Sequence, residues 1–206
     1  MFVVPLLTTL VFLALHKQHV GPWLAKQLRL QRSHIRWYVA ALSTLPVIIL
    51  STFFITNTDG QTLTVDPLTI LVLIGIFLFS GVCEQLGWTA YALPLLRQKM
   101  NAFAASLVLG AVWAAWHIIP YMQGQHTAEW ILGQLGYTVA LRVLLTWVYE
   151  GGNKNLWLAV LLQASSNVSA SLLPGTSYNP VIVAGATWGI IALAAAMRRA
   201  SRRRSE

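Results

Sequence analysis

Seven apolar segments, joined by short polar connections, are the feature that most constrains how this chain can fold. A bilayer core about 30 Å thick is crossed by roughly 17–25 apolar residues of α-helix. The first segment is too short to cross comfortably, so it would tilt little, thin the bilayer locally or insert only halfway. The pattern predicts an all-α, polytopic transmembrane helix bundle of about seven spans. The segments are 2–15, 37–55, 68–91, 102–121, 130–149, 156–173 and 181–197.

The composition agrees with a membrane protein and excludes two other classes. Of the 206 residues, 56% are hydrophobic and 10% are charged, whereas a soluble domain carries about 25% charged residues. Intrinsically disordered chains combine low hydrophobicity with high charge, so disorder is excluded as well. The length predicts a single integral membrane domain over residues 1–206.

The basic residues test the span pattern independently. All 14 Lys and Arg residues fall on alternate connections or near them, on one side of the predicted membrane. Arg142 lies inside segment 130–149, in the half nearer that side, and is expected to snorkel to the surface. The opposite connections carry Asp59, Asp66 and Glu129 and no Lys or Arg. The positive-inside rule therefore places the N-terminus outside and the C-terminus in the cytoplasm, as in a bacterial cytoplasmic membrane.

The basic tail at residues 198–206 explains much of the net charge of +8. In a soluble protein such a charge would suggest nucleic acid. Next to a membrane span, the tail and the basic connections are better interpreted as topology anchors that contact anionic lipid. No nucleic-acid partner is expected.

Two ionisable side chains lie deep inside predicted spans, where such groups are costly and usually functional. Glu84 precedes Met100 by the same distance in sequence as His117 follows Asn101, so the two flank a predicted hairpin turn symmetrically. At about 1.5 Å per residue, both side chains would lie roughly 24 Å from the turn, at the same depth. Gly87 follows one turn after Glu84 and would let a neighbouring backbone or a substrate approach closely.

The spacing alone leaves two interpretations of Glu84 and His117 open. One is a buried pair that orients the helices. The other is a general base and its partner acting on a water molecule. Pro94, ahead of the turn, predicts a kink or the end of its helix.

A second polar cluster occurs in segment 156–173: Gln163, Ser165, Ser166 and Asn167. Gln163 and Asn167 stand at i and i+4, so their carboxamides share one helix face. Their NH2 groups could donate to an oxygen that becomes negative in a transition state. Alone, the cluster is better explained as hydrogen-bonding contacts between membrane helices.

Three stretches together resemble a known family. They are E-Q-L-G-W-T-A-Y-A-L-P at 84–94, W-A-A-W-H-I-I-P at 113–120 and Q-A-S-S-N at 163–167. In this order, on successive spans, they are similar to the CPBP family of CAAX proteases and bacteriocin-processing enzymes, also called the ABI family. That family carries E-E-x-x-x-R, F-x-x-x-H and H-x-x-x-N motifs. The resemblance covers a core at about residues 30–173.

The resemblance implies an intramembrane endopeptidase that acts on a peptide or protein substrate within or beside the membrane. Glu84 matches the motif glutamate, the base that activates water. His117 matches the histidine that holds this water or the base. Asn167 matches the asparagine that stabilises the oxyanion, and Gln163 stands where the family has a second histidine, another oxyanion donor.

Three positions depart from the family motifs. Gln85 replaces the second glutamate, Thr89 replaces the arginine and Gln163 replaces the histidine. If the glutamate and arginine pair in the family, losing both leaves no unpaired buried charge. Gln163 can still donate a hydrogen bond, but not a charge-assisted one, which is about twice as strong.

No metal or other cofactor is expected. Family members are often described as metalloproteases, but a catalytic zinc usually takes three protein ligands, and His117 is the only imidazole at the predicted centre. The single cysteine, Cys83, can form neither an internal disulfide nor a thiolate cage.

Two other function classes stay open. The motif departures favour a catalytically silent relative, a membrane scaffold or bacteriocin-immunity factor, whereas Glu84, His117 and Asn167 together favour the enzyme. A proton-coupled carrier that uses Glu84 and His117 as a relay is disfavoured, because the chain shows no repeat symmetry and no second carboxylate within a span.

Overall fold

The computed structural model describes residues 2–57, 60–63, 66–174 and 177–204, and all regular secondary structure within these ranges is helical. This agrees with the predicted all-α class. Asp59 and the end of the basic tail at 205–206 lie outside the described residues. The elements are α1 (Val4–Leu15), α2 (Val20–Leu28), α3 (Ile35–Thr56), α4 (Pro67–Gln85), a π-helix η1 (Leu86–Ala92), α5 (Leu93–Arg97), α6 (Ala102–Gln123), α7 (Ala128–Gly151), α8 (Leu156–Ser171) and α9 (Pro180–Arg204).

Five helical stretches of the described chain are long and apolar enough to cross a membrane. They are α3, the continuous stretch from α4 to α5, α6, α7 and the part of α9 up to Met197. Each coincides with one of the predicted spans. The two remaining predicted spans form shorter helices, α1 with 12 residues and α8 with 16 residues.

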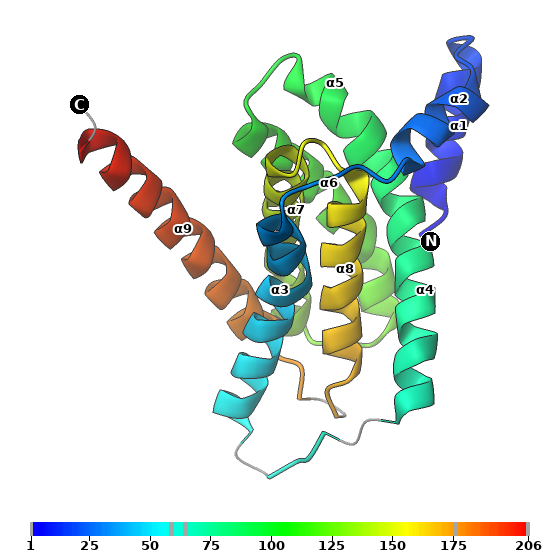
Figure 1. The fold of residues 1–206 in the computed structure, drawn as a ribbon. Helices are drawn as coiled ribbons and strands as arrows, with labels where there is room; N and C mark the ends of the chain where they lie inside the picture. Colours follow the sequence, from blue (N-terminus) through cyan, green and yellow to red (C-terminus); the bar gives the residue numbers. More distant parts are fainter. Residues whose placement is uncertain (1, 58–59, 64–65, 175–176, 205–206) are drawn as a thin grey trace.

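Helix α8 is short because it lies inside the bundle, in contact with α3, α4 and α7 (Figure 1). Leu158, Ala159, Val160 and Leu162 are all completely buried. Most of its side chains are buried, although the face with Trp157, Leu161, Ser165 and Val168 is partly exposed. Its polar face can therefore serve a site in the interior.

Helix α1 reaches only part of the way along the bundle. Its first turn lies beside the middle of the bundle, and the helix runs toward the end that also carries α2 and α5 (Figure 1). It packs against α4 and η1, burying Thr9 and Leu13. Segment 2–15 therefore forms a short helix that covers only part of the length of the bundle.

The predicted kink or end at Pro94 takes another form. The helix continues to Arg97, but its backbone widens into the π-helix η1 just before the proline. Pro94 has no N–H to donate, and its ring would clash with a carbonyl one turn earlier in a regular helix. The wide turn accommodates this, and π-turns of this kind often mark functional sites. Here the π-helix begins at Leu86, shortly after Glu84.

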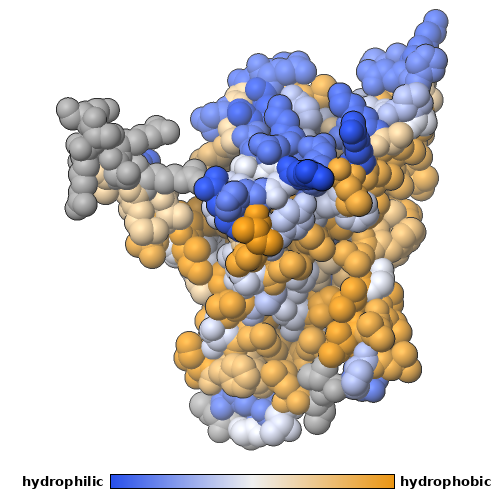
Figure 2. Space-filling view, in the orientation of Figure 1, coloured by the Kyte–Doolittle hydropathy of each residue, from blue (hydrophilic) through white to orange (hydrophobic). Residues whose placement is uncertain are grey.

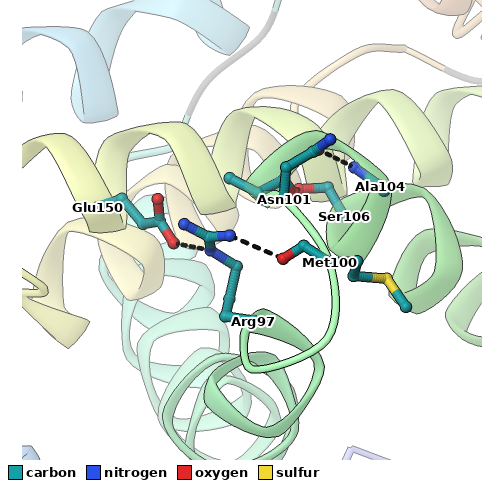
Figure 3. A network of polar contacts seen from close by, with 7 residues as sticks. Arg97, Met100, Asn101, Ala104, Ser106 and Glu150 are labelled. Atoms are coloured by element: carbon teal, nitrogen blue, oxygen red, sulfur yellow. Dashed lines mark hydrogen bonds and ion pairs between the residues drawn. The ribbon is translucent and has the colours of Figure 1, made fainter.

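The turn between α5 and α6 is held by polar contacts (Figure 3). Arg97 Nε donates to Glu150 Oε1 at the end of α7 over 2.6 Å, and Arg97 Nη1 donates to the Met100 carbonyl over 2.8 Å. Asn101 caps α6 by accepting from the Ala104 N–H over 2.9 Å. These contacts fix the hairpin whose arms carry Glu84 and His117.

Charged residues gather at the ends of the molecule, and an apolar surface lies between them (Figure 2). The connections beside α2, α5 and the start of α8 carry Lys17, Arg32, Lys99 and Lys154. The opposite end carries Asp66, which caps α4 through the Thr69 N–H. Large exposed apolar side chains cover the surface between the two ends, as expected for a surface that faces lipid. They include Val11, Leu42, Val47, Phe54, Leu71, Phe79, Val112 and Ile119.

We predict that Gly87→Ala destabilises the protein by displacing α1. A Cβ atom at this position would lie 2.6 Å from Pro5 Cβ and 2.7 Å from the Pro5 carbonyl oxygen. Such overpacking costs about 1–3 kcal/mol. The free energy of unfolding in mixed micelles, titrated with SDS, measures the effect.

Gly75→Ala is the matched control, because a Cβ at Gly75 in α4 meets nothing within 4 Å. It should leave stability unchanged or raise it by up to about 1 kcal/mol. Equal stability of the two variants would contradict the close approach of α1 to η1.

Candidate functional site

A cavity of about 200 Å³, partly open to the outside, lies between the start of α1 and the helices α4, η1, α6 and α8. Three of the four predicted catalytic residues line it: Glu84, His117 and Asn167. Its remaining walls are mostly apolar and aromatic, which suits a pocket that has to exclude bulk water. They are formed by Phe2, Pro5, Phe77, Ser80, Trp88, Trp113 and Trp116.

Glu84 stands in the last turn of α4 and is only 8% exposed. Its carboxylate accepts a hydrogen bond from Trp113 Nε1 on α6 over 3.1 Å. The Gln163 side chain on α8 also lies close to the carboxylate. A buried carboxylate without such donors would be very costly, so these contacts from two helices explain how Glu84 is tolerated here.

His117 is oriented by its own helix. Its Nδ1 lies 2.8 Å from the Trp113 carbonyl oxygen. A carbonyl can only accept, so Nδ1 carries the proton and Nε2 of the neutral ring is left as an acceptor. The ring is packed against Trp113 and Tyr121. Nε2 of His117 is therefore free to accept a hydrogen bond from a water molecule.

The polar cluster on α8 divides between two roles. Ser165 donates to the Ala41 carbonyl of α3 over 3.0 Å, and Ser166 hydrogen-bonds to the Tyr137 hydroxyl of α7. These serines join helices. Asn167 instead lines the cavity, whereas Gln163 lies beside Glu84 without lining it and hydrogen-bonds to Gln85.

Gln85 and Thr89, two of the altered motif positions, are fully buried and form a network of their own. Gln85 Nε2 donates to Gln163 Oε1 over 2.5 Å, and the Thr89 hydroxyl donates to Gln85 Oε1 over 2.5 Å. Arg142 on α7 joins this network, as its Nη2 donates to Gln85 Oε1 over 2.8 Å and to Thr89 Oγ1 over 2.9 Å.

The predicted snorkelling of Arg142 is therefore wrong. Its side chain is 0% exposed and points into the bundle, with its guanidinium 5.4 Å from the centre of the Trp113 ring. The two donated hydrogen bonds and the cation–π contact favour this inward position over the membrane surface. An arginine from another helix thus contacts both Gln85 and Thr89, two of the altered motif positions.

The side chains at the cavity do not fit a catalytic zinc. No group of three or more His, Cys, Asp or Glu side chains that could hold a metal ion is found in the described part of the chain. Glu84 and His117 provide one oxygen and one nitrogen ligand, and catalytic zinc takes three protein ligands. The chemistry that fits is that of a carboxylate, an imidazole and two carboxamides.

Comparison with known proteins gives the family of the chain. The family model for type II CAAX prenyl endopeptidase Rce1-like proteins matches residues 66–169, which is half of the chain. The chain belongs to this family. The CAAX prenyl protease 2 of Methanococcus maripaludis is 24% identical over 134 residues, covering 61% of this chain and 48% of that protein. This chain thus spans about half the length of the curated relative.

The chain is thus a multi-pass helical member of the Rce1-like family. Two residues at the site, Trp113 and Arg142, were not assigned from the sequence. Trp113, the donor to Glu84, precedes His117 by one helical turn, and this spacing could have identified it. Arg142 could not be found in this way, because it is distant in sequence from both Gln85 and Thr89.

We predict that Trp113→Phe destabilises the protein by about 1–3 kcal/mol, because it leaves the buried Glu84 carboxylate one donor short. The free energy of unfolding should recover when Glu84→Gln is added, because a buried neutral amide needs fewer hydrogen-bond donors than a buried carboxylate. The free energy of unfolding of Trp113→Phe and of the double variant is measured by SDS titration in mixed micelles.

Trp88→Phe provides the control at the same cavity. The Trp88 indole N–H has no hydrogen-bond partner within the described residues. Its removal should therefore lower the free energy of unfolding by less than removal of the Trp113 indole N–H. An equal loss in both variants would show that ring packing, and not the hydrogen bond, is responsible.

Proposed function

We propose that this protein is an intramembrane endopeptidase of the CAAX-protease type. The observation that carries the proposal is the meeting of Glu84, His117 and Asn167, from three different helices, around one cavity. Family membership supports peptide hydrolysis as the reaction class.

In the proposed reaction, a water molecule lies between Glu84 and Nε2 of His117. Glu84 takes a proton from this water while the oxygen attacks the scissile carbonyl carbon. The carbonyl oxygen becomes an oxyanion and accepts hydrogen bonds from the NH2 groups of Asn167 and Gln163. The C–N bond then breaks, and Glu84 returns the proton to the leaving amine.

The substrate class is proposed as a peptide or protein segment within or beside the membrane, because the cavity lies at the level of apolar protein surface. The relative from Methanococcus maripaludis is named a CAAX prenyl protease. A prenylated C-terminal segment is therefore the first substrate to assay, although no residue at the cavity specifies a lipid.

Glu84→Gln is expected to lower peptide cleavage by about 10²–10⁴-fold, the usual contribution of a general base. His117→Ala should lower it similarly, because the water loses its acceptor. Both are measured with purified protein in nanodiscs and a fluorogenic peptide, with Trp116→Phe at the cavity wall as the control. Cleavage retained by either variant would refute the mechanism.

A silent scaffold or immunity factor is the second candidate function. It is favoured by the closed hydrogen-bond network of Gln85, Thr89 and Gln163, which replaces three motif residues. This candidate predicts a cellular phenotype that is lost on deletion of the protein but unchanged in Glu84→Gln. A phenotype that disappears in Glu84→Gln would select the enzyme.

We also propose that the basic end faces the cytoplasm, in a bacterial cytoplasmic membrane, where its Lys and Arg residues contact anionic lipid. The C-terminus would lie on that side, and the N-terminal end of α1 points away from it.

The orientation predicts the labelling of introduced cysteines in intact cells. Lys154→Cys should be protected from a membrane-impermeant maleimide until the cells are opened, whereas Gln61→Cys should react at once. The native Cys83 is buried, so background labelling should be low. The reverse pattern would invert the proposed topology.

A further inference from the structure

Arg142 is a buried cation that the catalytic steps above do not use. It reaches the centre of the bundle from α7 and donates to two side chains, Gln85 and Thr89. Its Nε and Nη1 atoms have no hydrogen-bond partner among the described residues. Burying a cation with unsatisfied donors costs free energy, so a role for this arginine has to be sought in what it does to its neighbours.

The hydrogen-bonding character of arginine has a directional consequence. A guanidinium can only donate, so the atom of Gln85 that faces Arg142 must be the amide oxygen. The NH2 group of Gln85 is then forced to the opposite side, where it lies 2.5 Å from Gln163 Oε1. Gln163 must present its oxygen to Gln85 and its own NH2 elsewhere.

The second neighbour of the Gln163 amide is the carboxylate of Glu84. Gln163 lies beside this carboxylate, which as an ionised group can only accept hydrogen bonds. The NH2 group that Gln163 cannot use toward Gln85 is therefore the one turned to Glu84. If the oxygen and NH2 of Gln85 exchanged places, its oxygen would attract the NH2 of Gln163, and the oxygen of Gln163 would face Glu84 instead.

We propose that Arg142 is a positioning residue, which through Gln85 orients the amide of Gln163 so that its NH2 faces Glu84 and the reacting carbonyl. This inference rests on the proposed function for its consequence in catalysis, but the orientation itself is a property of the folded protein. Thr89 supports it, since its hydroxyl accepts from Arg142 and donates to the same Gln85 oxygen.

The first test observes the amides directly. In protein labelled with ε-¹⁵N glutamine, the NH2 signal of Gln163 is assigned by its loss in Gln163→Glu and is followed by NMR. Arg142→Met should shift or broaden this signal because Gln85 becomes free to rotate. Arg142→Lys, which also carries donors only, should leave the signal near its wild-type position.

The matched control is Thr146→Val, one turn further along α7. Thr146 is buried, and its hydroxyl has no partner in the described part of the structure, so the Gln163 signal should not move. An unchanged Gln163 signal in Arg142→Met would overturn the proposal, whatever the protein cleaves.

The second test reads catalysis. In Gln85→Glu the new carboxylate still accepts from Arg142 but cannot donate to Gln163, so the Gln163 amide should turn around. We expect kcat to fall by about 10²–10³-fold, as for the loss of one oxyanion donor, with little change in KM. Gln163→His introduces a ring that can donate a hydrogen bond. Added to Gln85→Glu, it should raise kcat at least about 10-fold above that of Gln85→Glu alone.

The two tests separate the two claims. If the wild type cleaves no peptide, the proposed function fails, and the Gln163 signal still decides the orientation. If the wild type is active and Gln85→Glu keeps its full kcat, the positioning role fails while the protease assignment stands.

Discussion

The burial of ionisable groups in an apolar bundle is the constraint on which the rest of this structure depends. Glu84 and Arg142 lie within helices whose outer surfaces are apolar, and each needs hydrogen-bonding partners that lipid cannot supply. Trp113 on α6 donates to Glu84, and Gln85 and Thr89 on the long α4–α5 stretch accept from Arg142, while Gln163 on α8 bonds to Gln85 and lies beside Glu84. The requirement to satisfy two buried groups thus determines how these helices meet.

The amide side chains are what connect the two charges. A glutamine has an acceptor at one end and donors at the other, so it can stand between a group that only donates and a group that only accepts. Gln85 joins Arg142 to Gln163 in this way, and Gln163 lies beside Glu84. This explains how motif positions can change in residue type without leaving a buried charge unpartnered: the positive charge now reaches the centre from α7.

Much of the architecture was predictable from the sequence because it depends on near neighbours in the chain. Each predicted span corresponds to a helix, and the alternate basic connections gather at one end of the bundle. Glu84, His117 and Asn167 were expected together and line one cavity. The inward position of Arg142 was not predictable, since snorkelling and burial are both open to an arginine in the half of its span nearer the basic end.

The sequence by itself determined the helical class and the apolar spans, and it singled out Glu84, His117 and Asn167, because hydropathy and motif spacing are local properties of the chain. Only the tertiary structure decided that α1 begins at the cavity, that most of α8 is buried, that a π-helix follows Glu84, and that Arg142 contacts Gln85 and Thr89. These features arise from contacts between residues far apart in sequence, where the direction of a donor or acceptor depends on which helices pack together.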